Sequence, residues 1–174
     1  MDLRLPEEIW LAGKGPSFDF YDWSASGEIR IGLNETAFLI PDCWGAFAKD
    51  FPIVERYISE PLNPSVTVFI KDTWPEKYHI FQRMFLWNRP IHANILFGTA
   101  VTSLQIFHTL GARTFHMVGF DSIDAKASTY AQKIKAIDGE GKNQDGYEQI
   151  NIRMKQVITS LGIKPIWEHI QMHF

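Results

Sequence analysis

Short apolar runs alternate along this chain with longer stretches in which apolar residues recur every three or four positions. Each short run fits one buried strand, and each longer stretch fits a helix with one apolar side. This alternation is typical of an α/β fold with a largely parallel sheet and helices on both faces. The strands predicted from the runs are Ile9–Ala12, Ile29–Leu33, Phe38–Ile40, Val66–Ile70, Phe115–Val118 and Ile163–Trp167.

The same pattern predicts two helices with clear ends. One begins with Thr99 as its N-cap and ends before Gly111, which stands where a helix-terminating glycine belongs. The other covers 145–161 and is closed by Gly162. Two less regular segments, the first predicted as a helix and the second open between strand and helix, are Phe47–Ile58 and His79–Trp87.

The first strand runs without a polar break into the turn Gly13-Lys14-Gly15-Pro16-Ser17. A buried strand that ends in Gly-x-Gly leaves backbone N–H groups free at a sheet edge, and such a turn favours an anion, most often phosphate. The turn is not a Walker A loop, because its lysine comes too early and no hydroxyl follows it. It is not a dinucleotide fingerprint either, because Phe18 stands where a third glycine is needed. A plain strand-ending turn is the alternative interpretation.

Other predicted strands are followed by residues that suit a nucleotide. Because ligands of open α/β sheets bind outside the carboxyl ends of the strands, we expect these residues to converge on Gly13–Ser17. Asn34 suits a base edge or a ribose hydroxyl, Thr99 at a helix start suits a phosphate, and Asp121 after Gly119 suits ribose hydroxyls. Capping and turn roles are the alternatives for these three polar residues.

Composition narrows the classes of protein that fit. At 174 residues, with 45% hydrophobic residues, the chain fits one folded domain spanning 1–174. A net charge of −3 argues against binding duplex nucleic acid. No apolar run approaches the roughly 20 residues that cross a bilayer, and the acidic start is unlike a signal peptide, so we expect a cytoplasmic protein. The single cysteine, Cys43, is expected to be packed as a small hydrophobe, and no residues at metal-ligand spacing predict a metal site.

Three segments in order carry a resemblance to known proteins: Ala12-Gly13-Lys14-Gly15-Pro16-Ser17, Gly32-Leu33-Asn34-Glu35, and the helix from Gly98-Thr99 that leads to Phe115-His116-Met117-Val118-Gly119-Phe120-Asp121. They resemble the bacterial lipooligosaccharide sialyltransferases, which use CMP-sialic acid and have a Rossmann-like nucleotide-binding domain. They also resemble the 6-hydroxymethylpterin diphosphokinase-like proteins. The resemblance spans roughly 9–168. It implies that the glycine turn lines the nucleotide phosphates, that Asn34 contacts the nucleotide, that Thr99 approaches the phosphate or sugar, and that Gly119 and Asp121 approach the ribose.

The chain departs from the sialyltransferase pattern at three places. In those enzymes two tyrosines steady the departing phosphate without a metal; Tyr130 matches the second, and Ile123 occupies the place of the first. Lys14 replaces a polar amide, and its charge favours a di- or triphosphate. The histidine base of the sialyltransferases is absent from its place in the pattern, so Asp138, Glu140 or a distant histidine would have to deprotonate the acceptor.

The sequence therefore predicts a single Rossmann-like α/β domain that uses an activated nucleotide donor. The first choice is a nucleotide-sugar glycosyltransferase that needs no metal or further cofactor and acts on an unknown acceptor. The alternatives are a non-catalytic nucleotide-binding protein, which senses or sequesters its ligand, and a diphosphokinase-like enzyme. The expected nucleotide-binding residues are Gly13, Lys14, Gly15, Ser17, Asn34, Thr99, Gly119 and Asp121, and the expected catalytic residues are Tyr130, Asp138 and Glu140.

Overall fold

The structure is a computed structural model that describes residues 3–88, 98–123 and 144–168. Its centre is one sheet of seven strands in the order β5-β4-β3-β2-β1-β6-β7, and every neighbouring pair is parallel. The predicted parallel α/β architecture is therefore confirmed. The strands are β1 (Glu8–Ala12), β2 (Arg30–Leu33), β3 (Gly45–Phe47), β4 (Thr67–Lys71), β5 (Met84–Trp87), β6 (Thr114–Val118) and β7 (Lys164–Trp167).

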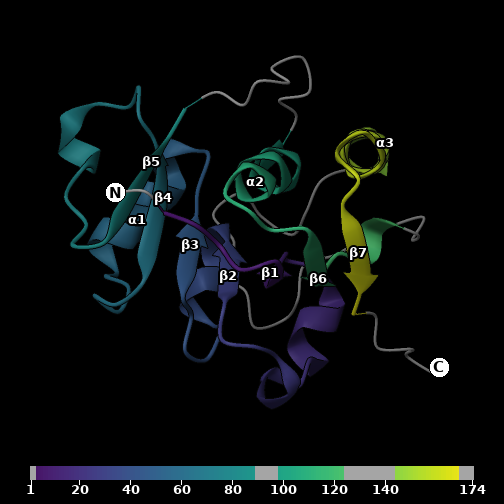
Figure 1. The fold of residues 1–174 in the computed structure, drawn as a ribbon. Helices are drawn as coiled ribbons and strands as arrows, with labels where there is room; N and C mark the ends of the chain where they lie inside the picture. Colours follow the sequence, from purple (N-terminus) through teal and green to yellow (C-terminus); the bar gives the residue numbers. More distant parts are fainter. Residues whose placement is uncertain (1–2, 89–97, 124–143, 169–174) are drawn as a thin grey trace.

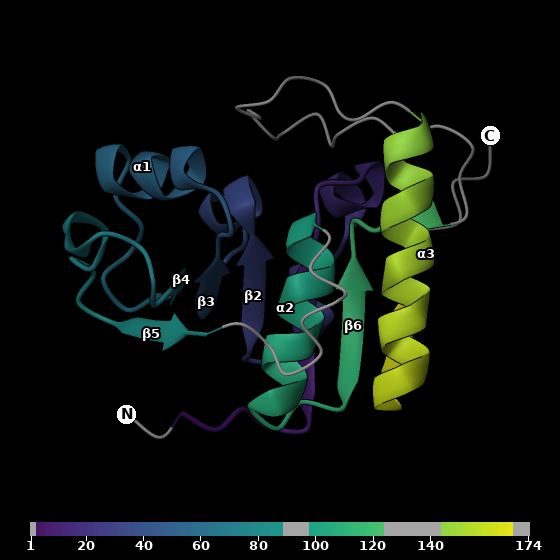
Figure 2. The same cartoon turned by 90° about the horizontal axis from the view of Figure 1, so that it is seen from above.

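Three α-helices accompany the sheet in the described ranges: α1 (Phe51–Ser59), α2 (Gly98–Thr109) and α3 (Gln144–Leu161). Figure 1 shows α2 and α3 on the same side of the sheet, while the 3-10 turns that follow β1, drawn in purple, lie on the other side. Figure 2 shows that α2 and α3 run antiparallel to β6. The amino ends of these helices therefore lie at the same edge of the sheet as the carboxyl ends of the strands.

Alternate residues of the central strands enter different cores on the two faces of the sheet. On one face, Leu11 and Phe47 belong to a core that includes Leu104 of α2 and Met154 of α3. On the other face, Ala46 of β3 and Val68 of β4 belong to a core built with α1, and Ala12 of β1 and Val118 of β6 belong to a third core. Because successive strand residues point to opposite faces, this division places helices on both faces of the sheet, as predicted.

The predicted strand at Phe38–Ile40 is wrong. Phe38 ends the 3-10 turn η3 (Asn34–Phe38), and the amides of the next two residues bond back to the carbonyl of Thr36. The third strand is instead the buried tripeptide Gly45–Phe47, which pairs with β2 and β4. The run Phe38–Ile40 is apolar in sequence but is not a buried strand, since Leu39 at its centre is 39% exposed.

Two other segments are settled by the structure. The helix predicted over 47–58 begins only at Phe51, because Asp50 stands at its N-cap position and a proline occupies its first turn. The ambiguous segment at 79–87 ends as strand β5. Among the described residues, no helix has the length and apolar character needed to cross a membrane.

The predicted helix ends are largely confirmed. Gly111 and Gly162 both have positive φ angles, 118° and 64°, and they follow α2 and α3 as terminating glycines do. The N-cap assignment of Thr99 is wrong, because α2 already includes Gly98. The chain enters α2 at Gly98, which has a φ of 81°, so Thr99 lies within the first turn of the helix.

Candidate functional site

The strand order reverses next to β1. From β1 the chain builds β2 to β5 outward on one side, and then returns to place β6 and β7 on the other side. The loops after β1 and β6 leave neighbouring parallel strands at this point of reversal. This is the place where open α/β sheets bind ligands, and it is the place predicted for Gly13–Ser17 and Gly119–Asp121.

The two loops at the reversal are joined by hydrogen bonds. Gly15 donates its N–H to the carbonyl of Gly119 at 2.7 Å. Ser17 donates both its N–H, at 3.0 Å, and its hydroxyl, at 2.9 Å, to Oδ2 of Asp121. The N–H of Gly119 in turn donates to Oγ of Ser17 at 3.1 Å. The structure therefore brings four of the predicted site residues together into one rigid cradle.

The glycines of the cradle are required by the close approach of the two loops. A Cβ added at Gly13 would lie 2.7 Å from the carbonyl oxygen of Gly119, and one added at Gly119 would lie 2.4 Å from the carbonyl oxygen of Gly13. A Cβ at Gly15 would lie 2.3 Å from Oδ2 of Asp121. Each loop thus excludes side chains from the other, which lets the backbones touch.

Three backbone N–H groups that were expected to be free in this turn are bonded within the protein. Gly13 donates its N–H to Val118, and the N–H groups of Gly15 and Ser17 are used in the contacts with the second loop. These amides stabilise the cradle from within. These three amides are therefore not available to a ligand.

Lys14 is held by a buried acid. Its Nζ lies 3.2 Å from Oε2 of Glu35, and the two side chains are only 13% and 2% exposed. Glu35 lies in η3 directly after β2, next to Thr36, whose hydroxyl donates to the carbonyl of Ala12 at the end of β1. Sequence reasoning missed Glu35, although it stands beside Asn34 in the quoted motif. The charge that Lys14 brings to the cradle is thus compensated within the protein.

Asn34 stands at the carboxyl end of β2 in a left-handed conformation, with a φ of 55°. Its side-chain oxygen is buried and has no hydrogen-bond partner among the described residues. Its backbone carbonyl accepts a hydrogen bond of 2.6 Å from the hydroxyl of Tyr57. Burial, and then the charges of Cys43 and Glu35, raise the pKa of Tyr57 well above its usual value, so this hydroxyl remains a donor. A buried amide oxygen without a donor is a place for a ligand hydroxyl or amino group.

The amino end of α2 contributes Thr99 from the same edge of the sheet (Figure 2). The free N–H groups at a helix start and the helix dipole favour an anion there. Gly98 contacts α3, because a Cβ added to it would lie 3.6 Å from a side-chain carbon of Ile150. Both long helices thus begin beside the reversal of strand order.

The predicted catalytic residues Tyr130, Asp138 and Glu140 lie outside the described residues. Ile123, which stands where the sialyltransferase pattern has a tyrosine, is described: it is 6% exposed and packs in the core with α2 and α3. Within the described ranges, no group of three or more His, Cys, Asp or Glu side chains is arranged to hold a metal ion.

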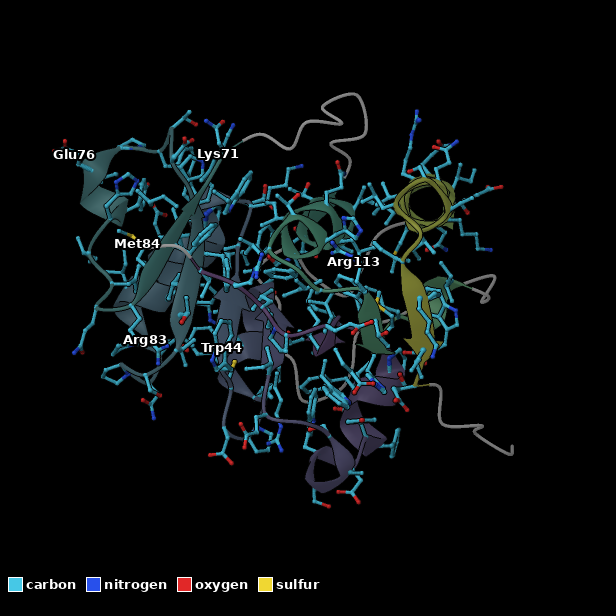
Figure 3. The ribbon with its side chains drawn as sticks, in the orientation of Figure 1. Trp44, Lys71, Glu76, Arg83, Met84 and Arg113 are labelled. Atoms are coloured by element: carbon cyan, nitrogen blue, oxygen red, sulfur yellow. The ribbon has the colours of Figure 1, made fainter. Side chains whose placement is uncertain are left out.

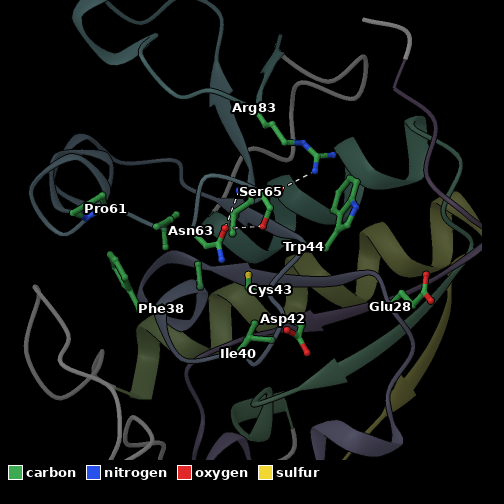
Figure 4. Close-up of a pocket in the computed structure, with 13 residues that line it drawn as sticks. Glu28, Phe38, Ile40, Asp42, Cys43, Trp44, Pro61, Asn63, Ser65 and Arg83 are labelled. Atoms are coloured by element: carbon green, nitrogen blue, oxygen red, sulfur yellow. Dashed lines mark hydrogen bonds between the residues drawn. The ribbon is translucent and has the colours of Figure 1, made fainter.

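A separate cavity of about 430 Å³ lies at the opposite, amino-terminal edge of the strands (Figure 4). Trp44 and Arg83 precede β3 and β5 at this edge, whereas Lys71 ends β4 at the other edge (Figure 3). Cys43 also lines the cavity, and burial raises the pKa of its thiol to about 11. The thiol is therefore protonated at neutral pH, in keeping with the predicted packing role.

Comparison with known proteins gives a likeness of fold. No protein-family model matches the chain, and no curated protein matches it.

The structure of the sialyltransferase CstII from Campylobacter jejuni, solved with cytidine 5′-monophosphate, is similar to this one. The TM-score is 0.59 and the sequence identity is 15%, over 92% of this chain and 79% of the CstII chain. The α-2,3-sialyltransferase Cst-I from the same organism has a TM-score of 0.59 and 13% identity over 95% and 78%. CstII with a trisaccharide acceptor and CMP has a TM-score of 0.53 and 14% identity. The chain therefore shares its α/β Rossmann-like fold with these sialyltransferases.

Proposed function

We propose that this protein is a transferase that uses an activated nucleotide donor, and that it is a nucleotide-sugar glycosyltransferase. The nucleotide would bind at the carboxyl edge of the sheet, between the loops after β1 and β6. The likeness in fold supports glycosyl transfer over diphosphate transfer, because the similar proteins are sialyltransferases.

The observation that carries the proposal is the cradle in which Ser17 and Asp121 join the two loops at the reversal of strand order. The hydrophobic core of the fold does not require such a rigid, glycine-dependent junction between two loops at this edge of the sheet. A ligand site does need it, because binding groups must be held in fixed positions.

Three groups beside the cradle are proposed to contact the nucleotide. The buried side-chain oxygen of Asn34 would accept a hydrogen bond from a base amino group or a ribose hydroxyl. The helix start at Thr99 would receive the phosphate. Lys14 would direct an N–H toward the same phosphate while it remains paired with Glu35. Gly119 and Asp121 would lie beside the ribose.

The transfer itself is proposed to use the sequence-derived catalytic residues. Tyr130 would donate a hydrogen bond to the departing phosphate, and Asp138 or Glu140 would remove the proton of the acceptor hydroxyl. No metal is assigned to either step, and no cofactor beyond the donor nucleotide is assigned.

One observation favours the second candidate, a nucleotide-binding protein without catalysis. Ile123 is packed in the core at the position where the sialyltransferase pattern places a tyrosine, so one phosphate-steadying group of that pattern is absent. A protein that senses or sequesters a nucleotide needs the cradle but not this group.

Donor binding and donor hydrolysis test both candidates. The protein is titrated with CMP-, UDP- and GDP-sugars in a calorimeter, and the release of free nucleotide from each donor is then followed over time. Binding with slow hydrolysis supports the transferase, because enzymes of this class transfer some donor to water. Binding with the donor returned intact supports the sequestering protein, and failure of every donor to bind refutes both.

The substitution Asn34→Gly tests whether the donor binds at the proposed site. Glycine keeps the left-handed backbone and removes only the side chain, so we expect at least a tenfold loss of donor affinity. Asp42→Gly is the matched control, because Asp42 has a φ of 50° as well but its side chain is 98% exposed. Equal effects of the two substitutions would remove Asn34 from the proposed site.

A further inference from the structure

The ion pair between Lys14 and Glu35 limits the charge that the cradle offers to a ligand. Glu35 is 2% exposed, and a carboxylate so far from water is stable only with a compensating charge. Lys14 supplies that charge across 3.2 Å. If Lys14 moved away to a ligand phosphate, the carboxylate would be left buried and uncompensated.

A second carboxylate lies in the same cradle. Asp121 accepts both hydrogen bonds from Ser17, so its position is fixed within the loops that would surround the ligand. The single lysine of Gly13–Ser17 is thus accompanied by two acids, one in contact with it and one in the adjoining loop. Together, these three side chains carry a net negative charge when ionised.

This balance of charge changes the expectation drawn from Lys14 alone. A lysine in a glycine turn favours di- and triphosphates, as it does in nucleotide-binding loops where it is available to the phosphates. Here each added phosphate brings negative charge toward Glu35 and Asp121, while Lys14 remains paired with Glu35. The pair therefore disfavours phosphate groups beyond the first.

We propose that Glu35 is a specificity-determining residue, which limits the number of phosphate groups in the ligand by holding Lys14 and compensating its charge. The inference rests on the proposed nucleotide site. It assigns to Glu35 a role that does not require contact with the ligand, since the residue acts through Lys14.

Glu35→Gln tests the role, because glutamine keeps the shape of the side chain and removes its charge. Dissociation constants of cytidine mono-, di- and triphosphate are measured by calorimetry at one salt concentration, without divalent cations. In the unsubstituted protein we expect no gain in affinity from mono- to triphosphate. In Glu35→Gln we expect the triphosphate to gain about tenfold relative to the monophosphate, because Lys14 is released to bind it.

Two further variants distinguish this mechanism from a general change in charge. Glu60→Gln removes the same charge from the end of α1, where Glu60 is 61% exposed and paired with Arg56, and should leave the order of affinities unchanged. The double substitution Lys14→Met with Glu35→Gln should abolish the triphosphate gain. Circular dichroism and thermal unfolding establish that each variant is folded before its affinities are compared.

The outcomes separate this inference from the proposed function. If Glu35→Gln binds the monophosphate with an unchanged ratio of tri- to monophosphate affinity, the role of Glu35 is wrong and the nucleotide site stands. If no cytidine, uridine or guanosine nucleotide binds the unsubstituted protein, the proposed function is wrong. Inorganic triphosphate then still decides the role of Glu35: binding gained only in Glu35→Gln supports it, and no gain overturns it.

Discussion

Ser17 donates two hydrogen bonds to one carboxylate oxygen of Asp121, a residue 104 positions further along the chain. The contact closes the loop after β1 onto the loop after β6 and so fixes the proposed binding edge. Because hydrogen bonds to a charged acceptor are stronger than neutral ones, this single carboxylate contributes to both stability and site geometry.

Asp121→Ala is expected to lower the free energy of unfolding by about 2 to 3 kcal/mol, since it leaves the N–H and the hydroxyl of Ser17 without their acceptor. Urea denaturation measures the loss. Asp22→Ala is the matched control: Asp22 accepts the same two kinds of bond from Ser24, but in an exposed turn between residues two positions apart. A loss at Asp22 as large as that at Asp121 would show that the junction between the loops adds nothing.

Gly119→Ala should destabilise the protein much more than Gly162→Ala. Both glycines have positive φ angles, 73° and 64°, so each alanine carries a backbone strain of about 1 kcal/mol. At Gly162 nothing lies within 4 Å of the new Cβ, whereas at Gly119 the carbonyl oxygen of Gly13 lies 2.4 Å away. We expect a further loss of about 2 kcal/mol or more at Gly119 from this clash, measured as the difference between the two urea unfolding curves. Similar curves would mean that the loops can separate freely.

The Cys43 thiol should make stability depend on pH in the alkaline range. Burial raises its pKa from 9.0 to about 11, so above pH 9 the unfolded chain loses this proton before the folded protein does. Stability therefore falls between about pH 9 and 11, by roughly 2 to 3 kcal/mol in total. Cys43→Ala should lack this part of the decline, so the difference between the two proteins isolates the thiol. If urea denaturation gives the same decline in stability with pH for both proteins, the decline does not come from the Cys43 thiol.

His116 links three strands through two acids. Its Nδ1 lies 2.6 Å from Glu168, which follows β7, and its Nε2 lies 2.8 Å from Glu8 at the start of β1, while its ring stacks on Trp10 at 4.0 Å. Glu168→Gln should cost about 1 kcal/mol of stability, and Glu8→Gln less, because the side chain of Glu8 is 53% exposed and that of Glu168 only 28%. Thermal unfolding at low and high salt measures both. The opposite ranking would show that exposure does not govern the two pairs.

The parts of the fold that local sequence determines were predictable. The run at 9–12 is apolar throughout because β1 is covered on both faces, and Gly162 ends α3 through its own backbone conformation. Strand β3 was not predictable in this way. Its three residues Gly45–Phe47 are a strand because β2 and β4 pair with them on either side, and three residues carry no periodicity of their own.

Some features of the candidate site could also be predicted from the sequence, and others depend on tertiary packing. The meeting of Gly15 and Ser17 with Asp121 follows from the rule that parallel strands end at one edge, so the sequence could predict it. The pairing of Lys14 with Glu35 depends on how far two side chains reach between adjacent loops, which strand order does not determine. Asn34 was identified from its type and place, but its buried oxygen and its support by Tyr57 depend on the packing of α1.

The central place of β1 also has a consequence for how the chain folds. Glu8 and its partner His116 are 108 residues apart in sequence, so β1 gains its neighbour β6 only after the long segment between the two strands has been made. Contacts of such long range slow folding, because the intervening chain must be ordered before they form. During synthesis, strands β2 to β5 can assemble on one side of β1 before β6 is available to pair with its other edge. The proposed binding edge therefore forms only once β6 is present, because Ser17 needs Asp121 after β6 as its acceptor.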